Sequence, residues 1–194
     1  MSTPSTQGRA QAVARFVSIA LHPFVVLAWL ALAATWWLDP TAMLRTAVGI
    51  ATGIAIVWAF VLQRRRAGHW QTVDASRPQE RPLLYLLALL VAGAYWWWMG
   101  GRASATSTGI LAAVAMLCLA GIANRWIKLS LHMASLAFAG CALLPLMPLA
   151  GMGMVALLPV LAWSRLRMAR HTWPEVAGGA LLGALCGSGI ALSG

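Results

Sequence analysis

The chain has 194 residues, of which 61% are hydrophobic and 9% are charged, and its mean hydropathy is +0.78. Because roughly a quarter of the residues in soluble domains are charged, this composition excludes an ordinary soluble protein and predicts an integral membrane protein. Its 14 basic residues outnumber the 4 acidic ones. In so apolar a chain this excess predicts contact with lipid headgroups and other anions, and no binding of nucleic acid.

Apolar segments follow one another along the chain, and each crossing of the hydrocarbon core needs about 20 apolar residues. The candidate crossings lie at about 16–38, 42–62, 83–99, 105–123, 127–147, 149–163 and 175–192. The fourth segment begins in a run of small residues and the sixth is short and contains Pro159, so we expect six or seven crossings. Each crossing is predicted to be helical because unpaired backbone groups are costly in lipid. The predicted fold is an all-α, polytopic transmembrane helix bundle, with a disordered tail at 1–15 and a single domain at 16–194.

The basic residues are distributed unevenly between the two predicted sides of the membrane. If all seven segments cross, the N-terminus, the 63–82 loop, the 124–128 turn and the 164–174 loop share one side. That side carries 12 of the 14 basic residues, namely Arg9, Arg15, Arg64, Arg65, Arg66, Arg77, Arg81, Arg125, Lys128, Arg165, Arg167 and Arg170. The positive-inside rule places it in the cytoplasm. We therefore expect a bacterial inner-membrane protein whose N-terminus is cytoplasmic.

Three polar stretches lie on this predicted cytoplasmic side. They are DASRPQERP (74–82), KLSLH (128–132) and SRLRMARH (164–171), which Glu175 follows. Clustered cations, histidines and carboxylates at a membrane face favour an anionic substrate and proton-transfer or nucleophilic chemistry. A helix that begins at the second stretch would turn Lys128 and His132 to one face and leave its first amides free for an anion.

The order of these motifs resembles that of the type 2 phosphatidic acid phosphatase superfamily of membrane lipid phosphatases. The family pattern is Lys-x6-Arg-Pro, then Pro-Ser-Gly-His, then Ser-Arg-x5-His-x3-Asp. The corresponding residues here are Asp74-x6-Arg81-Pro82, then Leu129-Ser130-Leu131-His132, then Ser164-Arg165-x5-His171-x3-Glu175. The resemblance covers residues 74–175, about half of the chain, and the third motif is the most specific.

The resemblance implies a phosphatase that works in two steps, with no metal and no other cofactor. His171 would attack phosphorus and form a phosphohistidine, Glu175 would orient its ring, and His132 would act as general acid and base. Arg81 and Arg165 would bind the phosphate oxygens. The implied substrates are a membrane lipid phosphate or an isoprenoid phosphate or diphosphate reached from the bilayer, and a phosphotransferase would differ only in its acceptor.

The chain departs from the family pattern at three positions. Asp74 replaces a lysine, and we expect Lys128 to supply the missing cation. Leu131 replaces a glycine, so Ser130 is expected to contribute its hydroxyl or amide to phosphate binding. Glu175 replaces an aspartate. Supporting positions at the edge of the predicted site are Asp74, Arg77 and Ser164.

Two alternatives remain open at this point. Thr172 and Glu175 fit a helix capping box, which by itself would explain the glutamate, although one side chain can serve both purposes. The departures at Asp74 and Leu131 also allow a catalytically inactive member of the family that acts as a membrane scaffold or as a carrier of lipids or anions. His22, beside Pro23 in the first apolar segment, is expected to be a packed histidine and no ligand.

Overall fold

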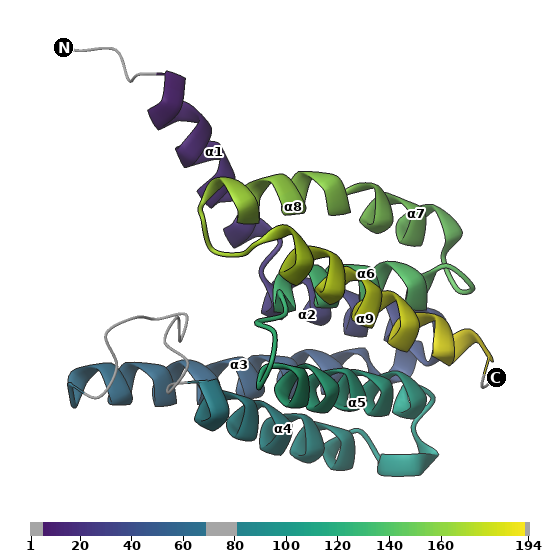
Figure 1. Ribbon diagram of the computed structural model, residues 1–194. Helices are drawn as coiled ribbons and strands as arrows, with labels where there is room; N and C mark the ends of the chain where they lie inside the picture. Colours follow the sequence, from purple (N-terminus) through teal and green to yellow (C-terminus); the bar gives the residue numbers. More distant parts are fainter. Residues whose placement is uncertain (1–5, 69–80, 193–194) are drawn as a thin grey trace. The chain divides into compact units, whose positions relative to one another are not determined.

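The structure is a computed structural model that describes residues 6–68 and 81–192, and all regular elements in these two ranges are helices. This confirms the all-α prediction for the described part of the chain. Figure 1 labels the α-helices α1 (Thr6–Ala20), α2 (Pro23–Leu38), α3 (Met43–Arg66), α4 (Arg81–Trp98), α5 (Ser107–Ala123), α6 (Leu131–Leu143), α7 (Pro148–Ala156), α8 (Leu158–Arg167) and α9 (Trp173–Leu192). Short 3₁₀ helices at Pro40–Ala42 and Gly101–Ala103 precede α3 and α5.

Two stretches of helix in the described residues are long and apolar enough to cross a membrane. They are Pro40–Arg66 and Pro148–Arg167, and a third crossing results if α1 and α2 form one bent span. The helices Pro82–Trp98, Ser107–Ala123 and Leu131–Leu143 are apolar but shorter, and a helix rises only about 1.5 Å per residue. The chain is therefore compatible with an integral membrane protein, and the six or seven crossings stay a prediction.

Helix α1 begins at Thr6, so the expectation of a disordered tail at 1–15 is wrong from this residue onward. The reason is tertiary packing. Ala14 and Ser18 are buried, and the Ala14 carbonyl accepts a hydrogen bond from the Ser164 hydroxyl of α8 at 2.6 Å. Packing against another helix stabilises a polar segment whose own helical propensity is marginal.

The first predicted crossing, 16–38, is broken between α1 and α2, and the two helices meet at an angle of 41°. The break follows from the His22-Pro23 dipeptide, because proline disfavours helical geometry at the residue before it. Pro23 itself fits the first position of α2, where its missing amide donor would have no partner. The break places His22 directly before α2 and Ser18 in the last turn of α1.

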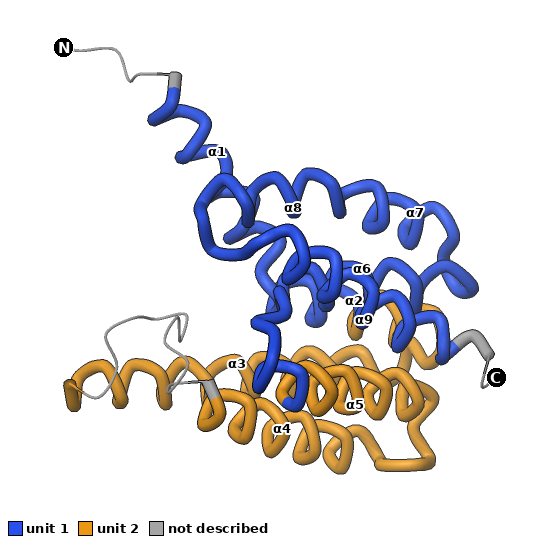
Figure 2. The backbone as a smooth tube through the Cα atoms, viewed as in Figure 1, with its two compact units in different colours: residues 1–30, 122–194 blue, residues 31–121 orange. Residues whose placement is uncertain are grey.

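The chain divides into two compact units, which are coloured separately in Figure 2 and are described one at a time here. The first unit comprises residues 1–30 and 122–194 and contains α1, the beginning of α2, and α6 to α9. The prediction of a single domain at 16–194 stays a prediction. Every residue of the candidate site described below belongs to the first unit.

Helices α6 and α9 of the first unit pack with their backbones in close approach. A Cβ atom on Gly179 would lie 2.5 Å from the Ser130 carbonyl oxygen, and one on Gly187 would lie 2.5 Å from the Phe138 carbonyl oxygen. On Gly183, between them, a Cβ would meet the Ala134 carbonyl even more closely. Such small residues at every fourth position allow two apolar helices to pack tightly. Helix α6 is the buried centre of this unit, since ten of its residues are buried.

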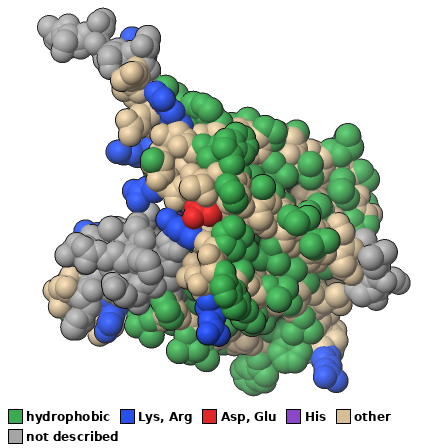
Figure 3. Space-filling model, in the orientation of Figure 1, with side chains coloured by type: hydrophobic (Ala, Val, Ile, Leu, Met, Phe, Trp, Pro, Cys, Tyr) green, Lys and Arg blue, Asp and Glu red, His purple; other side chains and the backbone are tan. Residues whose placement is uncertain are grey.

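The second unit comprises residues 31–121, with α3 and α4 adjacent and most of α5. Its internal polar contacts include a buried pair of hydroxyl groups, Thr35 and Thr46, whose oxygens are 3.1 Å apart. The Trp96 indole donates to the Ser107 hydroxyl at 2.8 Å. Hydrophobic side chains are nevertheless widely exposed in both units, as with Leu44 at 77% and Leu149 at 86%. Figure 3 shows hydrophobic side chains over much of the visible surface. Exposed apolar surface of this extent is expected of a protein that contacts lipid.

Candidate active site

The candidate site begins at the end of α8, where the chain reverses direction. Ala169 has a φ of 52°. Its amide donates to the Leu166 carbonyl at 2.9 Å, and the Arg170 amide donates to the Arg165 carbonyl at 3.1 Å. These two bonds form a Schellman motif, a helix end that usually has glycine at the left-handed position. The tight turn brings His171 back beside the end of the helix that carries Arg165.

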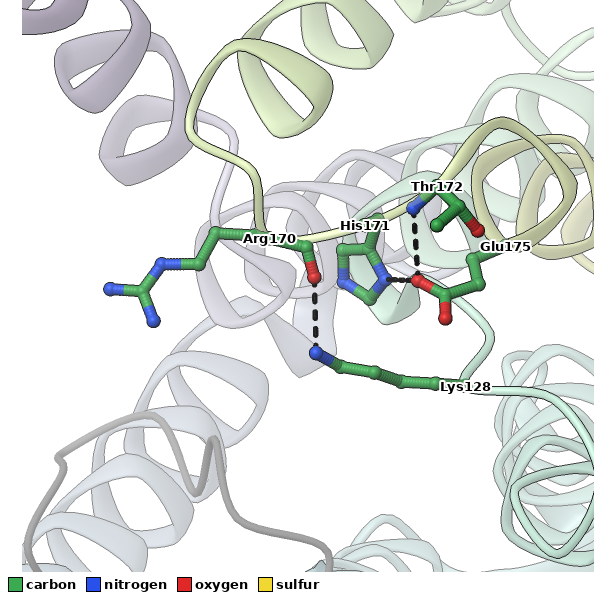
Figure 4. Close-up of polar contacts among 5 residues, drawn as sticks. All are labelled: Lys128, Arg170, His171, Thr172 and Glu175. Atoms are coloured by element: carbon green, nitrogen blue, oxygen red, sulfur yellow. Dashed lines mark hydrogen bonds and ion pairs between the residues drawn. The ribbon is translucent and has the colours of Figure 1, made fainter.

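His171 and Glu175 form the closest side-chain pair of the site (Figure 4). The His171 Nδ1 atom lies 3.0 Å from Glu175 Oε2, and the His171 side chain is 7% exposed. An ionised carboxylate only accepts hydrogen bonds, so Nδ1 carries the proton and Nε2 keeps its lone pair. Figure 4 shows this second nitrogen on the side of the ring where the Lys128 amino group lies. The predicted pairing of His171 with Glu175 is therefore present.

Glu175 also completes part of the predicted cap of α9. Its Oε2 atom accepts a hydrogen bond from the Thr172 backbone amide at 3.1 Å. This is the bond in which the third residue of a helix reaches back to the capping residue. Glu175 thus contacts the Thr172 amide and the imidazole with the same oxygen atom, and its catalytic role stays a prediction.

The pKa of His171 is lowered from 6.5 to about 4. Burial is the main cause because it disfavours the charged ring, and the positive charge of Arg165 lowers the pKa further. Glu175 opposes both effects through its hydrogen bond and its charge, while Lys128 adds to them. The ring is consequently neutral at pH 7, the state in which Nε2 can act as a nucleophile.

Lys128 lies in the loop before α6, because this helix begins only at Leu131. The expectation that Lys128 and His132 share one helical face is therefore wrong. Lys128 instead extends toward the α8–α9 loop, where its amino group donates to the Arg170 carbonyl at 3.0 Å (Figure 4). This contact with the α8–α9 loop holds the Lys128 amino group close to His171, in place of the shared helical face that the sequence predicts.

Ser130 occupies the position before the first residue of α6 and is fully buried. Its backbone amide donates to the Glu175 carbonyl at 3.0 Å. Its hydroxyl oxygen is buried without a hydrogen-bond partner and caps no amide of the helix. The first amides of a helix have no partner within that helix, so the start of α6 presents several donors together with an unpaired buried hydroxyl.

Arg165 projects from α8 toward α1 and is only 9% exposed. Its Nη1 atom donates to the Ser18 hydroxyl at 2.7 Å. The neighbouring Ser164 donates to the Ala14 carbonyl and thus joins the same two helices. This bond joins α8 to α1, and the supporting role of Ser164 in the site stays a prediction.

His132 lies in the first turn of α6 and faces the break between α1 and α2. Its Nε2 atom is 3.5 Å from the Ser18 hydroxyl oxygen, and its ring meets the His22 ring edge-on with 5.2 Å between the centroids. The charges of Arg165 and His171 both act on His132. The second and third motifs and the first helix break thus meet in one cluster.

No family model, no curated protein and no solved structure matches this chain. The site is therefore interpreted from its own geometry. In the described residues, no group of three or more His, Cys, Asp or Glu side chains could hold a metal ion.

Three predicted site residues are not among the described residues of the first unit. Asp74 and Arg77 lie outside the described residues. Arg81 is the first residue of α4 and belongs to the second unit. The described cluster of the first unit therefore contains residues of the second and third motifs.

Sequence reasoning missed Ser18 as a member of the site and treated His22 only as a packing residue. The available signal was a histidine within an apolar segment, since ionisable residues in such segments are uncommon and often functional. Ser18 precedes His22 by four residues, the spacing that places two side chains on one face of a helix. Neither residue is part of the motifs, so the pattern on which the prediction depended did not include them.

Proposed function

We propose that this protein is a metal-independent membrane phosphatase of the type 2 phosphatidic acid phosphatase kind, acting on a lipid or isoprenoid phosphate through a phosphohistidine. The observation that carries the proposal is the hydrogen bond between His171 Nδ1 and Glu175 Oε2. It leaves the Nε2 lone pair of a neutral imidazole available for attack. Arg165 and His132 lie near enough to act on this ring electrostatically.

In the first step, the Nε2 lone pair of His171 attacks phosphorus and forms a P–N bond. The P–O bond to the alcohol or phosphate leaving group breaks, and its electron pair goes to the leaving oxygen. His132, which takes up a proton when the anionic substrate binds, donates that proton to the leaving oxygen. The imidazole of His171 becomes positively charged, and the Glu175 carboxylate stabilises this charge through the Nδ1 proton.

In the second step, water attacks the phosphohistidine. His132, which the first step left neutral, accepts a proton from the water as its oxygen forms a bond to phosphorus. The P–N bond breaks, and its electron pair returns to His171 Nε2. Inorganic phosphate leaves, and both imidazoles regain their starting states.

Fixed positive charges around the phosphoryl group account for most of the expected rate acceleration. Arg165 binds phosphate oxygens through its planar guanidinium group. Lys128, held near His171 through the Arg170 carbonyl, supplies the cation that is missing from the first motif. The start of α6 adds backbone amides and the unpaired Ser130 hydroxyl.

The substrate is proposed to be amphiphilic because the chain is largely apolar and exposes many large hydrophobic side chains. A phosphate on a lipid or prenyl chain would lie at the membrane surface while its tail stays in the bilayer. The positive-inside rule assigns this surface to the cytoplasm. Phosphatidic acid, phosphatidylglycerol phosphate and prenyl diphosphates are the corresponding candidate substrates.

Phosphate release from mixed micelles tests the proposal. Purified full-length protein is incubated with phosphatidic acid or farnesyl diphosphate in the presence of a chelator. We expect release of inorganic phosphate without added metal, and a loss of at least about 1,000-fold in His171→Ala, which removes the nucleophile. His132→Ala should lose about 100- to 10,000-fold, the usual contribution of a general acid and base.

A chemical trap separates the two histidines. When ³²P-labelled phosphatidic acid is used and the reaction is stopped with alkali, wild type should retain an alkali-stable, acid-labile label. His171→Ala should retain none, whereas His132→Ala should still become labelled, although slowly. If no substrate releases phosphate, or if His171→Ala is as active as wild type, the catalytic proposal is wrong and a scaffold or carrier role takes its place.

A further inference from the structure

Helix α1 contributes a polar residue to the candidate site although it lies outside all three motifs. Ser18 is 7% exposed and contacts both Arg165, at 2.7 Å, and His132, at 3.5 Å. Its hydroxyl group therefore lies between the proposed phosphate-binding arginine and the proposed general acid.

The chemistry of the three groups determines the direction of these hydrogen bonds. A guanidinium group only donates, so the Ser18 oxygen accepts from Arg165. The Ser18 proton then needs an acceptor. A hydroxyl group in a helix commonly donates to the carbonyl four residues earlier, which is Ala14. That carbonyl already accepts the helical amide of Ser18 and the Ser164 hydroxyl.

Both lone pairs of the Ala14 oxygen are thus used, and His132 Nε2 is the side-chain acceptor that the structure places beside the Ser18 hydroxyl. If Nε2 accepts, the neutral His132 ring carries its own proton on Nδ1. The distance of 3.5 Å is at the long end for a hydrogen bond, as is common for catalytic groups before substrate binds.

His22 restricts the same ring from another direction. Its Nδ1 atom accepts a hydrogen bond from the Phe24 amide at 3.3 Å, so its own proton is on Nε2 while the ring is neutral. The His22 ring meets the His132 ring edge-on, an arrangement that aromatic rings favour. The break between α1 and α2 therefore supplies a hydrogen-bond donor and a packing surface to His132.

We propose that Ser18 is a positioning residue that couples Arg165 to His132 and holds the neutral His132 ring in its Nδ1-protonated form. The proposed effect of Ser18 on catalysis rests on the phosphatase activity proposed above, whereas its proposed effect on the His132 tautomer does not. Nδ1 of His132 is then the nitrogen that exchanges protons with the leaving group and with water. Helix α1, which lies outside the motifs, thereby determines which nitrogen of His132 exchanges protons with the leaving group and with water.

Nitrogen-15 NMR of the purified full-length protein in nanodiscs tests this tautomer directly. The protein is labelled in its histidine rings, and the His132→Gln spectrum identifies the His132 signals. Wild type is expected to show Nδ1 protonated and Nε2 unprotonated at neutral pH. In Ser18→Ala the signals should move toward the Nε2-protonated form, and Ser18→Thr, which keeps the hydroxyl group, should restore the wild-type pattern.

Kinetics on phosphatidic acid provide the second measurement. Ser18→Ala is expected to lower kcat by about 10- to 100-fold, the loss typical when a group that orients a functional imidazole is removed, and Ser18→Thr should recover most of it. Ser135→Ala is the matched control. Ser135 is also buried and lies three residues after His132 on α6, but its hydroxyl donates to the His132 backbone carbonyl at 3.1 Å.

The outcomes separate the two proposals. If the NMR pattern changes as expected while no variant or wild type releases phosphate, Ser18 positions His132 and the phosphatase proposal fails. If wild-type His132 is protonated on Nε2, or if Ser18→Ala leaves its signals unchanged, the positioning role is wrong whatever the activity. A loss of activity in Ser18→Ala that Ser18→Thr does not restore, or that Ser135→Ala matches, also contradicts it.

Discussion

His171 receives its hydrogen-bond partner from four residues away, whereas His132 receives its partner from 114 residues away. The first pair belongs to the α8–α9 connection, where the end of one helix and the start of the next follow each other directly. The second pair joins the start of α6 to the break between α1 and α2. The two proposed catalytic histidines are thus held by a local and a distant contact.

This difference predicts different responses to mutation. The His171–Glu175 bond depends on the start of α9 and should persist wherever that helix forms. The His132–Ser18 contact depends on α1 packing against α8 through Ser164 and Arg165, so changes anywhere along that packing should weaken it. Variants at Glu175, Lys128 and Ala169 test the His171–Glu175 pair, and the Ser18 variants test the His132–Ser18 contact.

Apart from the loss of either histidine, the largest effect is expected from Glu175→Gln. Glutamine also caps helices from this position, so the cap should be kept, and loss of the negative charge near the helix N-terminus should cost less than about 1 kcal/mol. The charge that stabilises the His171 imidazolium is lost, and kcat should fall by about 10- to 100-fold. Phosphate release and denaturant unfolding of the same preparation measure both quantities.

Glu175→Asp separates the effect of side-chain length from that of charge, because it keeps the negative charge and has the shorter side chain of the family pattern. We expect it to retain more activity than Glu175→Gln. If Glu175→Gln unfolds more easily but turns over substrate at the wild-type rate, Glu175 is only a capping residue. The hydrogen bond between His171 and Glu175 would then not contribute to catalysis.

A second, smaller effect concerns the protonation of His171. Its pKa of about 4 predicts that the ring stays largely neutral at pH 5, whereas a histidine of ordinary pKa 6.5 would be almost fully protonated there. NMR titration of the ring in the full-length protein measures this midpoint. Lys128→Gln should raise the midpoint, because a positive charge is removed, and Glu175→Gln should lower it.

The same pKa has a consequence for stability. Between pH 6.5 and about 4, the unfolded chain binds a proton at His171 that the folded chain does not, so this residue makes the free energy of unfolding fall as the pH is lowered through that window. His171→Gln should weaken the pH dependence of unfolding there. An observed midpoint at or above 6.5 would mean that the ring is not buried beside Arg165 as described.

The smallest effect is expected at Ala169, the left-handed residue in the turn before His171. A non-glycine residue in this conformation costs about 1 kcal/mol. Ala169→Gly should therefore raise the free energy of unfolding by about that amount, measured by denaturant unfolding in detergent. Gly100→Ala, at a φ of 105° in the second unit, is the reciprocal control and should lower it. A destabilised Ala169→Gly would show that the turn is not held in this geometry.

Much of the fold could be predicted because hydrophobic content and segment length are properties of the sequence itself. Residues 42–62, 83–99, 105–123 and 175–192 were predicted as helices, and α3, α4, α5 and α9 occupy them with ends shifted by a few residues. The predictions were wrong where tertiary packing or a proline determines where a helix begins or breaks. Helix α1 extends into the predicted tail, the first segment breaks at His22, and the fifth yields a helix only from Leu131.

For the candidate site, the sequence by itself determined the pair of His171 and Glu175, because residues four apart at a helix start meet through local geometry. It also identified His132, Arg165 and Ser130 as neighbours by motif. The tertiary structure alone decided that Ser18 and His22 join them and that Lys128 approaches through the Arg170 carbonyl. These contacts connect helices far apart in the chain, and their geometry comes from the packing of buried surfaces, which sequence spacing does not encode.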